Sequence, residues 1–116
     1  MDISDLRNIC KKLKGVTEDI KWEHHLCFNI GGKMFLMTSP DEVPCSAVFK
    51  VSDEEFDEII QQPGFSASAY IGRYKWVSLD NISRLSKKEW EHYLRQSYEL
   101  VASRLPKKLR KEIGIK

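Results

Sequence analysis

Gly31-Gly32-Lys33-Met34-Phe35 is the stretch that decides the fold of this chain. Two consecutive glycines between apolar runs predict a β-hairpin with a type I′ turn, because glycine adopts the positive φ angles of both turn positions without strain. A two-residue loop pairs Ile30 with Lys33 and Phe28 with Phe35. The predicted core face of the hairpin carries Leu26, Phe28, Ile30, Phe35 and Met37. The opposite face carries Cys27, Asn29, Met34 and Leu36.

Other elements follow on both sides of the hairpin. Its strands are predicted over residues 26–30 and 33–38, and further strands over 46–51, 66–70 and 74–79. Helices are predicted over residues 3–14, over 53–61 and from residue 87 onward, and a short basic helical turn is expected after Pro106. Ser52 with Glu55, and Ser86 with Glu89, show the capping-box pattern of a helix start.

The order α-β-β-β-α-β-β-α predicts an α+β fold. We expect a two-layer α/β sandwich, with an antiparallel sheet and helices packed on one of its faces. A length of 116 residues suits one modest core, so residues 1–116 are expected to form a single domain.

Charge and cysteine content narrow the class of protein. The formal net charge of +2 is too small to imply nucleic acid by itself, but six lysines and arginines accompany one glutamate from residue 104 onward. Such a segment attracts phosphates or forms a solvated final helix. The absence of a long apolar run, an acidic N-terminus unlike that of a signal peptide, and three irregularly spaced cysteines predict a cytoplasmic protein without membrane contact.

His24, His25 and Cys27 invite a metal-site or nucleophile interpretation. Adjacent histidines before a strand point to opposite sides, and no Cys-x-x-Cys pair supplies further ligands, so we expect no metal site. Gly31-Gly32 leads into a strand, whereas a phosphate-binding glycine loop leads into a helix. No catalytic group and no cofactor are therefore predicted.

The aromatic-basic stretch from residue 70 to 77 offers a different kind of site. On a strand, Val77 and Leu79 would face the helices, while Tyr74 and Trp76 would face away. An open sheet face would make Tyr74 and Trp76 an aromatic platform edged by cations, a surface that stacks bases and holds phosphates. The alternative is that Trp76 packs under a loop or near Trp22.

Several short motifs, in order along most of the chain, resemble the MmcQ/YjbR family of small bacterial proteins. They are Gly32-Lys33-Met34-Phe35, the Pro63-Gly64 turn, Tyr70 with Arg73, Trp76, Val77 and Leu79, Ser97-Tyr98 with Leu100-Val101, and Leu105-Pro106-Lys107-Lys108. The resemblance implies a fold like that of CyaY/frataxin and of type III secretion chaperones. It also implies DNA binding, because family members are described as DNA-binding proteins with a double-wing arrangement. It implies no enzyme activity and assigns no role to His24 or His25.

The leading expectation is a non-enzymatic DNA-binding domain. Its candidate contact residues are Lys33, Lys50, Arg73, Lys75, Trp76, Lys107 and Lys108. One alternative is a protein-interaction module, such as a small chaperone or adaptor, which uses an apolar Met34/Leu36 face. Another is a small-molecule pocket near Trp76, Tyr98 and Arg73.

Overall fold

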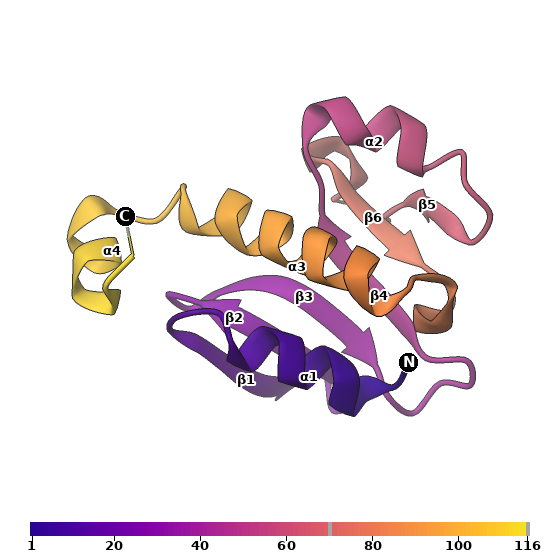
Figure 1. Cartoon of the computed structure of the whole chain (residues 1–116), viewed down its shortest axis with the longest axis horizontal. Coiled ribbons are helices and arrows are strands. Elements are labelled where there is room, and N and C mark those ends of the chain that lie inside the picture. The colour runs from indigo at the N-terminus through magenta and orange to yellow at the C-terminus, as the bar shows by residue number, and fades with distance from the viewer. Residues whose placement is uncertain (70, 116) are drawn as a thin grey trace.

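The computed structural model describes residues 1–69 and 71–115, and it confirms the predicted α+β fold (Figure 1). Its elements are α1 (Ile3–Lys11), β1 (Val16–Lys21), β2 (His25–Ile30), β3 (Lys33–Ser39), β4 (Ser46–Lys50), α2 (Asp53–Ile59), β5 (Phe65–Ala67), η1 (Gly72–Tyr74), β6 (Trp76–Leu79), η2 (Ile82–Arg84), α3 (Lys87–Ala102) and α4 (Lys107–Ile113). The predicted elements occur in the predicted order, with one further strand, β1, between α1 and β2. The basic helix after Pro106 is confirmed as α4.

One six-stranded antiparallel sheet has the order β1-β2-β3-β4-β6-β5. Helices α1 and α3 lie across the same face of this sheet (Figure 1). The core between the two layers is built from fully buried side chains, the largest of which are Trp90, Phe28, Phe35 and Phe49. No helix among the described residues is long and apolar enough to cross a bilayer.

Strand β1 was not predicted. It is an edge strand with four exposed positions, and its sequence mixes charged with apolar residues, so it lacks the continuous apolar signal of the inner strands. Pairing with β2 along its whole length, from Val16 opposite Ile30 to Lys21 opposite His25, holds it in place. Asn29 reinforces the pairing by donating from Nδ2 to Oδ1 of Asp19 at 3.0 Å.

The Gly31-Gly32 turn is confirmed, with φ angles of 57° and 80°. Ile30 pairs with Lys33 as predicted, but a bulge then shifts the register, so that Phe28 pairs with Leu36 and not with Phe35. The prediction of the hairpin faces was wrong beyond this point. Leu36 is fully buried in the core, whereas Met37 pairs with Cys27 on the opposite face and is half-buried.

A contact from α3 explains the bulge. The hydroxyl of Ser97 donates to the carbonyl oxygen of Phe35 at 2.6 Å. A carbonyl satisfied by a side chain needs no partner on a neighbouring strand, so the extra residue is tolerated inside a buried sheet. The ring of Phe35 is also buried, with its centroid 5.6 Å from that of Tyr98 in an edge-on arrangement.

Two predicted strand boundaries differ from the structure. Strand β6 begins at Trp76, because the preceding residues form the 3-10 turn η1 and Lys75 has a left-handed φ of 69°. The orientation of Val77 and Leu79 toward the core is confirmed. Strand β5 covers Phe65–Ala67, and Tyr70, the predicted end of that strand, lies outside the described residues.

Both predicted serine caps are present, but one of the two capping boxes is incomplete. Ser86 and Glu89 bond reciprocally. Ser52 accepts from the backbone N–H of Glu55, yet the Glu55 carboxylate does not return the bond. Its Oε1 lies 3.3 Å from Nε2 of His92, and the Ser52 N–H donates instead to Gln96. Competing partners on α3 therefore replace the local contact.

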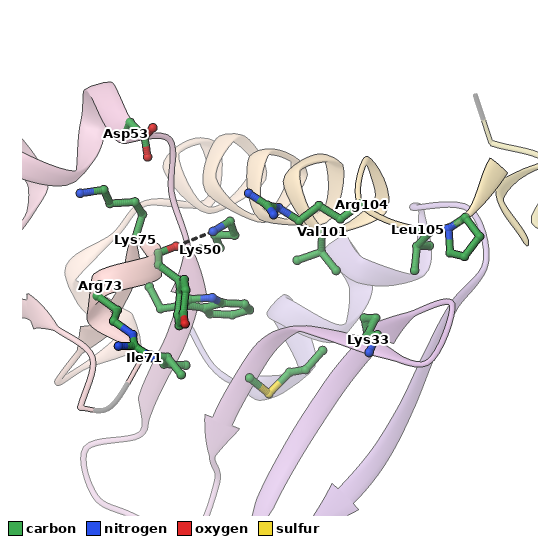
Figure 2. Close-up of a pocket in the computed structure, with 13 residues that line it drawn as sticks. Lys33, Lys50, Asp53, Ile71, Arg73, Lys75, Val101, Arg104 and Leu105 are labelled. Carbon is green, nitrogen blue, oxygen red and sulfur yellow. Dashed lines mark hydrogen bonds between the residues drawn. The ribbon is translucent and has the colours of Figure 1, made fainter.

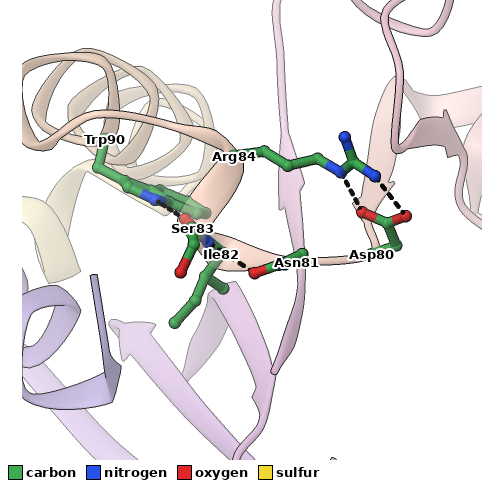
Figure 3. A network of polar contacts seen from close by, with 6 residues as sticks. All are labelled: Asp80, Asn81, Ile82, Ser83, Arg84 and Trp90. Carbon is green, nitrogen blue, oxygen red and sulfur yellow. Dashed lines mark hydrogen bonds and ion pairs between the residues drawn. The ribbon is translucent and has the colours of Figure 1, made fainter. Parts of the chain in front are cut away.

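The connection from β6 to α3 is held by local polar contacts (Figure 3). The indole N–H of Trp90 donates to the carbonyl of Ile82 at 2.8 Å, and the Asn81 side chain accepts from the Ser83 N–H at 2.9 Å. Arg84 pairs with Asp80 at 2.6 Å. Because the Trp90 ring is fully buried, this bond fixes where α3 starts on the sheet.

The hairpin tip fits under the corner between α3 and α4. A Cβ placed on Gly31 would lie 2.7 Å from Cδ1 of Leu105, closer than real Cβ atoms approach. Two independent reasons therefore require glycine at position 31: the positive φ angle and the close approach of Leu105. The packing brings Lys33 beside the C-terminal end of α3.

Candidate functional site

A groove opens where β3 and β4 separate. The two strands pair from Ser39 opposite Ser46 to Leu36 opposite Phe49. Beyond that pair β3 continues into the hairpin, while Lys50 of β4 pairs with Trp76 of β6. Val101 in the last turn of α3 and Arg104, which follows the helix, line the space between them (Figure 2). The resulting cavity has a volume of about 740 Å³.

Positive charge dominates this groove. Five cations line it: Lys33, Lys50, Arg73, Lys75 and Arg104. Among the described residues that line it, Asp53 is the only acid. The groove thus has a local excess of four positive charges on a chain whose formal net charge is +2. In Figure 2 Lys33 lies on the hairpin side, and Lys50, Arg73 and Lys75 lie on the other side.

Lys50 lies at the centre of the charge cluster. Its ammonium donates to the carbonyl of Tyr74 and lies 6.0 Å from the ring centroid of Trp76 (Figure 2). Burial lowers the pKa of Lys50, and the positive charge of Arg104 lowers it further, against the opposing effect of Asp53. Such a cation is short of compensating negative charge, which an anionic ligand would supply.

Arg73 and Lys75 are both held against aromatic rings. The guanidinium carbon of Arg73 lies 4.8 Å from the ring centroid of Tyr74, which is 53% exposed. Nζ of Lys75 lies 4.8 Å from the ring centroid of Phe56. The cation–π contacts orient both side chains at the rim without neutralising them.

The groove also has an apolar wall. It is formed by Met34, Ile71, Trp76, Val101, Leu105 and Pro106. Trp76 is half-buried and faces this space, whereas Trp22 is 69% exposed beside His25 on the β1–β2 turn. Of the two interpretations of Trp76, the structure favours the one in which its ring borders an accessible surface.

Five of the seven sequence-predicted contact residues line the groove together: Lys33, Lys50, Arg73, Lys75 and Trp76. Tyr74 lines it too, but from η1 and not from the predicted strand. Lys107 and Lys108 do not line it; they begin α4 directly after Pro106 and are exposed.

The sequence analysis missed Arg104 as a site residue. The available signal was its position as the first cation of the basic segment that begins at residue 104. Leu36 of the predicted protein-interaction face and Tyr98 of the predicted small-molecule pocket do not line the groove. Leu36 is buried in the core, and the hydroxyl of Tyr98 donates to the backbone of Lys14.

His24, His25 and Cys27 have ordinary structural partners. Nδ1 of His24 lies 3.6 Å from Asp41, and Nδ1 of His25 lies 3.1 Å from the Ser39 hydroxyl. Burial raises the pKa of Cys27. In the part of the chain that the structure describes, no three His, Cys, Asp or Glu side chains gather as metal ligands would.

Comparison with known proteins agrees with this architecture. The model of the YjbR family matches residues 11–100. The structure is similar to the crystal structure of protein DR2400 from Deinococcus radiodurans, a DUF419 domain, with a TM-score of 0.87 and 24% identity over 99% of this chain and 89% of that one. It is also similar to a Pseudomonas syringae protein solved by structural genomics, with a TM-score of 0.70 and 17% identity over 86% of this chain and 98% of that one. No curated protein matches the chain.

Proposed function

The chain belongs to the YjbR family, and from this premise we propose that it is a non-enzymatic nucleic-acid-binding domain whose ligand is DNA. The observation that supports the proposal is the gathering of five cations, from the hairpin, β4, the η1 region and the α3–α4 connection, around one groove. These residues span positions 33 to 104 of the sequence, and only the fold brings them together.

Lysine and arginine side chains at the rim would contact phosphate oxygens. Phosphate contacts position a protein on nucleic acid but carry no sequence information, so binding would be tolerant of sequence. Lys33 is exposed at the hairpin tip and lines the groove, and a lysine in such a place can rest its aliphatic stem on apolar surface while its ammonium reaches outward. Lys107 and Lys108 would extend the contact beyond the groove, along the exposed side of α4.

We propose binding rather than catalysis because of the side chains available. Asp53 is the only carboxylate among the described residues that line the groove, and none of the hydrogen bonds found there joins it to a lysine or to Tyr74. General acid–base and nucleophilic catalysis use positioned groups within hydrogen-bonding reach of each other, whereas the lysines and arginines here suit contact with an anion. A DNA ligand and three free cysteines are both consistent with a cytoplasmic location.

A salt titration tests the proposal. Affinity for a short DNA is measured by fluorescence anisotropy between about 50 and 200 mM salt. Counterion release predicts a log–log slope of about 0.9 per phosphate contacted on duplex DNA, and about 0.7 on a single strand. Five groove cations therefore predict a slope of about −3 to −5.

The double variant Lys33→Ala/Arg73→Ala should weaken binding and reduce the magnitude of the slope by about 2. The matched control is Lys87→Ala/Lys88→Ala, which removes two exposed lysines at the start of α3, outside the groove. The proposal fails if no binding occurs at about 50 mM salt, or if the groove variant and its control behave alike.

The concavity of the site favours a second candidate, a small anionic molecule with an aromatic ring. A cavity of about 740 Å³ lies within the range of small-molecule pockets, about 300–1,000 Å³. A small ligand would make few phosphate contacts, so its affinity would depend weakly on salt. The slope of the titration separates the two candidates.

A further inference from the structure

We propose that the groove takes an unpaired base together with its neighbouring phosphates, so that the DNA ligand is single-stranded. This inference rests on the proposed function and adds the form of the nucleic acid. Its basis is the combination of a recessed cavity, an accessible tryptophan and a surrounding set of cations in one place.

The shape of the site favours a strand whose bases can enter it. A duplex presents phosphates on a convex surface and keeps its bases stacked inside. Phosphate contact alone therefore needs a flat or gently curved basic surface. Here the cavity is recessed between the hairpin that holds Lys33 and the η1 segment that holds Arg73 (Figure 2). A base turned out of a single strand can enter such a space.

The apolar wall gives a base something to contact. Trp76 and Met34 line the groove as half-buried side chains, and a ligand made of phosphates alone would leave their accessible parts in water. Aromatic side chains in single-strand-binding proteins stack on bases, and every base has a π-face for this contact. Trp76 is the ring placed for stacking inside the groove, and Tyr74 offers a second, more exposed ring at the rim.

The cations lie where the phosphates on either side of a base would run. Arg73 is stacked on Tyr74, and guanidinium planes themselves stack on unpaired bases. Lys33 approaches from the hairpin and Arg104 from the α3–α4 connection, so that positive charge lies on both sides of the apolar wall (Figure 2). Backbone contact on both sides of a stacked base is how single-strand grooves follow a chain.

The test compares four ligands on the unmodified protein at about 50 mM salt. They are an oligothymidylate of about 12 nucleotides, an abasic strand with the same number of phosphates, a duplex of the same length, and thymidine monophosphate as competitor. The oligothymidylate should bind at least about tenfold more tightly than the abasic strand or the duplex.

Two tryptophan variants test whether the base stacks on Trp76. Trp76→Leu keeps an apolar side chain and should weaken oligothymidylate binding by about 5- to 100-fold, the effect of losing one stacked base, and should weaken duplex binding, which stacks no base, by a clearly smaller factor. Trp22→Leu removes an exposed tryptophan outside the groove and should change neither. The abasic strand is measured on the unmodified protein, so that arm of the test holds even if Trp76→Leu is poorly folded.

The outcomes distinguish the two proposals. Duplex or abasic binding as tight as that of the oligothymidylate overturns the single-strand inference and leaves DNA binding in place. Monophosphate competing at the same concentration as the oligothymidylate shows that the ligand is a free nucleotide and also overturns it. If no DNA binds, the proposed function itself is wrong.

Discussion

The hydroxyl of Ser97 lies 2.6 Å from the carbonyl oxygen of Phe35, to which it donates a hydrogen bond across 62 positions of sequence. The same hydroxyl accepts from the backbone N–H of Lys50 at 3.0 Å. One buried side chain thus joins β3 and β4 at the point where their direct pairing ends. The groove begins immediately beyond this bridge, with Lys50 on its wall.

Ser97→Ala should destabilise the protein by about 2–3 kcal/mol, because it leaves a buried carbonyl and a backbone N–H without this partner. The free energy of unfolding is measured by urea denaturation. Ser103→Ala is the control: Ser103 directly follows α3, is exposed, and its hydroxyl donates to the carbonyl of Leu100 at 2.8 Å. Its effect should stay within about 0.5 kcal/mol. Equal effects of the two variants would contradict a structural role for the bridge.

Gly31→Ala should cost more stability than Gly32→Ala. Both glycines have positive φ, so each substitution introduces about 1 kcal/mol or more of backbone strain. Only at Gly31 would the new Cβ also collide with Leu105, whereas nothing lies within 4 Å of a Cβ at Gly32. Overpacking should add about 1–3 kcal/mol at Gly31. Thermal or urea unfolding of the pair checks this, and an equal loss would mean that the α3–α4 corner moves away freely.

The Lys75→Gly variant should have a higher free energy of unfolding than the Lys75→Val variant. Lys75 has a φ of 69°, which glycine adopts freely and a β-branched residue adopts at high cost. Both variants remove the same ammonium and its contact with Phe56. We expect Lys75→Gly to be more stable than Lys75→Val by at least about 1–2 kcal/mol in urea unfolding. The two should weaken DNA binding equally if charge is what matters there.

As the pH is raised, DNA affinity should begin to fall before pH 10.5, the ordinary pKa of a lysine, because the pKa of Lys50 is lowered and its ammonium loses the proton earlier. The sign follows from phosphate attraction: protonated Lys50 binds, and neutral Lys50 does not. Anisotropy titrations at rising pH measure the effect. Lys50→Met should abolish this early fall, while Lys33→Met, at another position in the same groove, should retain it. A fall that persists unchanged in Lys50→Met would contradict the assignment.

Cys45 should react with alkylating reagents well before Cys10. Cys10 is fully buried, and burial raises its pKa to about 12, so thiolate is scarce and inaccessible near pH 8. Cys45 is half-buried, and its pKa is raised as well, which makes it slow but reachable. Timed alkylation followed by peptide mass spectrometry measures the order. Labelling of Cys10 as fast as that of Cys45 would show that α1 opens readily.

The predictable part of the fold lay in local chemistry. Two glycines determine the hairpin turn, Ser86 with Glu89 determines the start of α3, and Pro106 marks the start of α4, because each of these signals acts within a few residues. Strand β1 escaped prediction because an exposed edge strand has little apolar signal of its own. Its conformation depends on pairing with β2.

Most residues of the candidate site could be predicted individually from the sequence, but their arrangement around one groove could not. Arg73, Lys75 and Trp76 stood out as an aromatic-basic run, and Lys33 stood out at the turn. These residues lie near Arg104 because β3 and β4 separate beyond the Leu36–Phe49 pair and the C-terminal end of α3 lies over the gap. No local pattern specifies that separation, which depends on Ser97 contacting two strands far away in sequence.

The sequence by itself determined the α+β class, the Gly31-Gly32 turn, the amphipathic α3 and the residue types of the groove, because backbone preference and hydrophobic periodicity are local properties. Only the tertiary structure decided the register beyond Asn29, the burial of Leu36 and the assembly of five cations around Trp76. These features depend on which side chain satisfies which buried backbone group, and that choice is made when distant elements pack together.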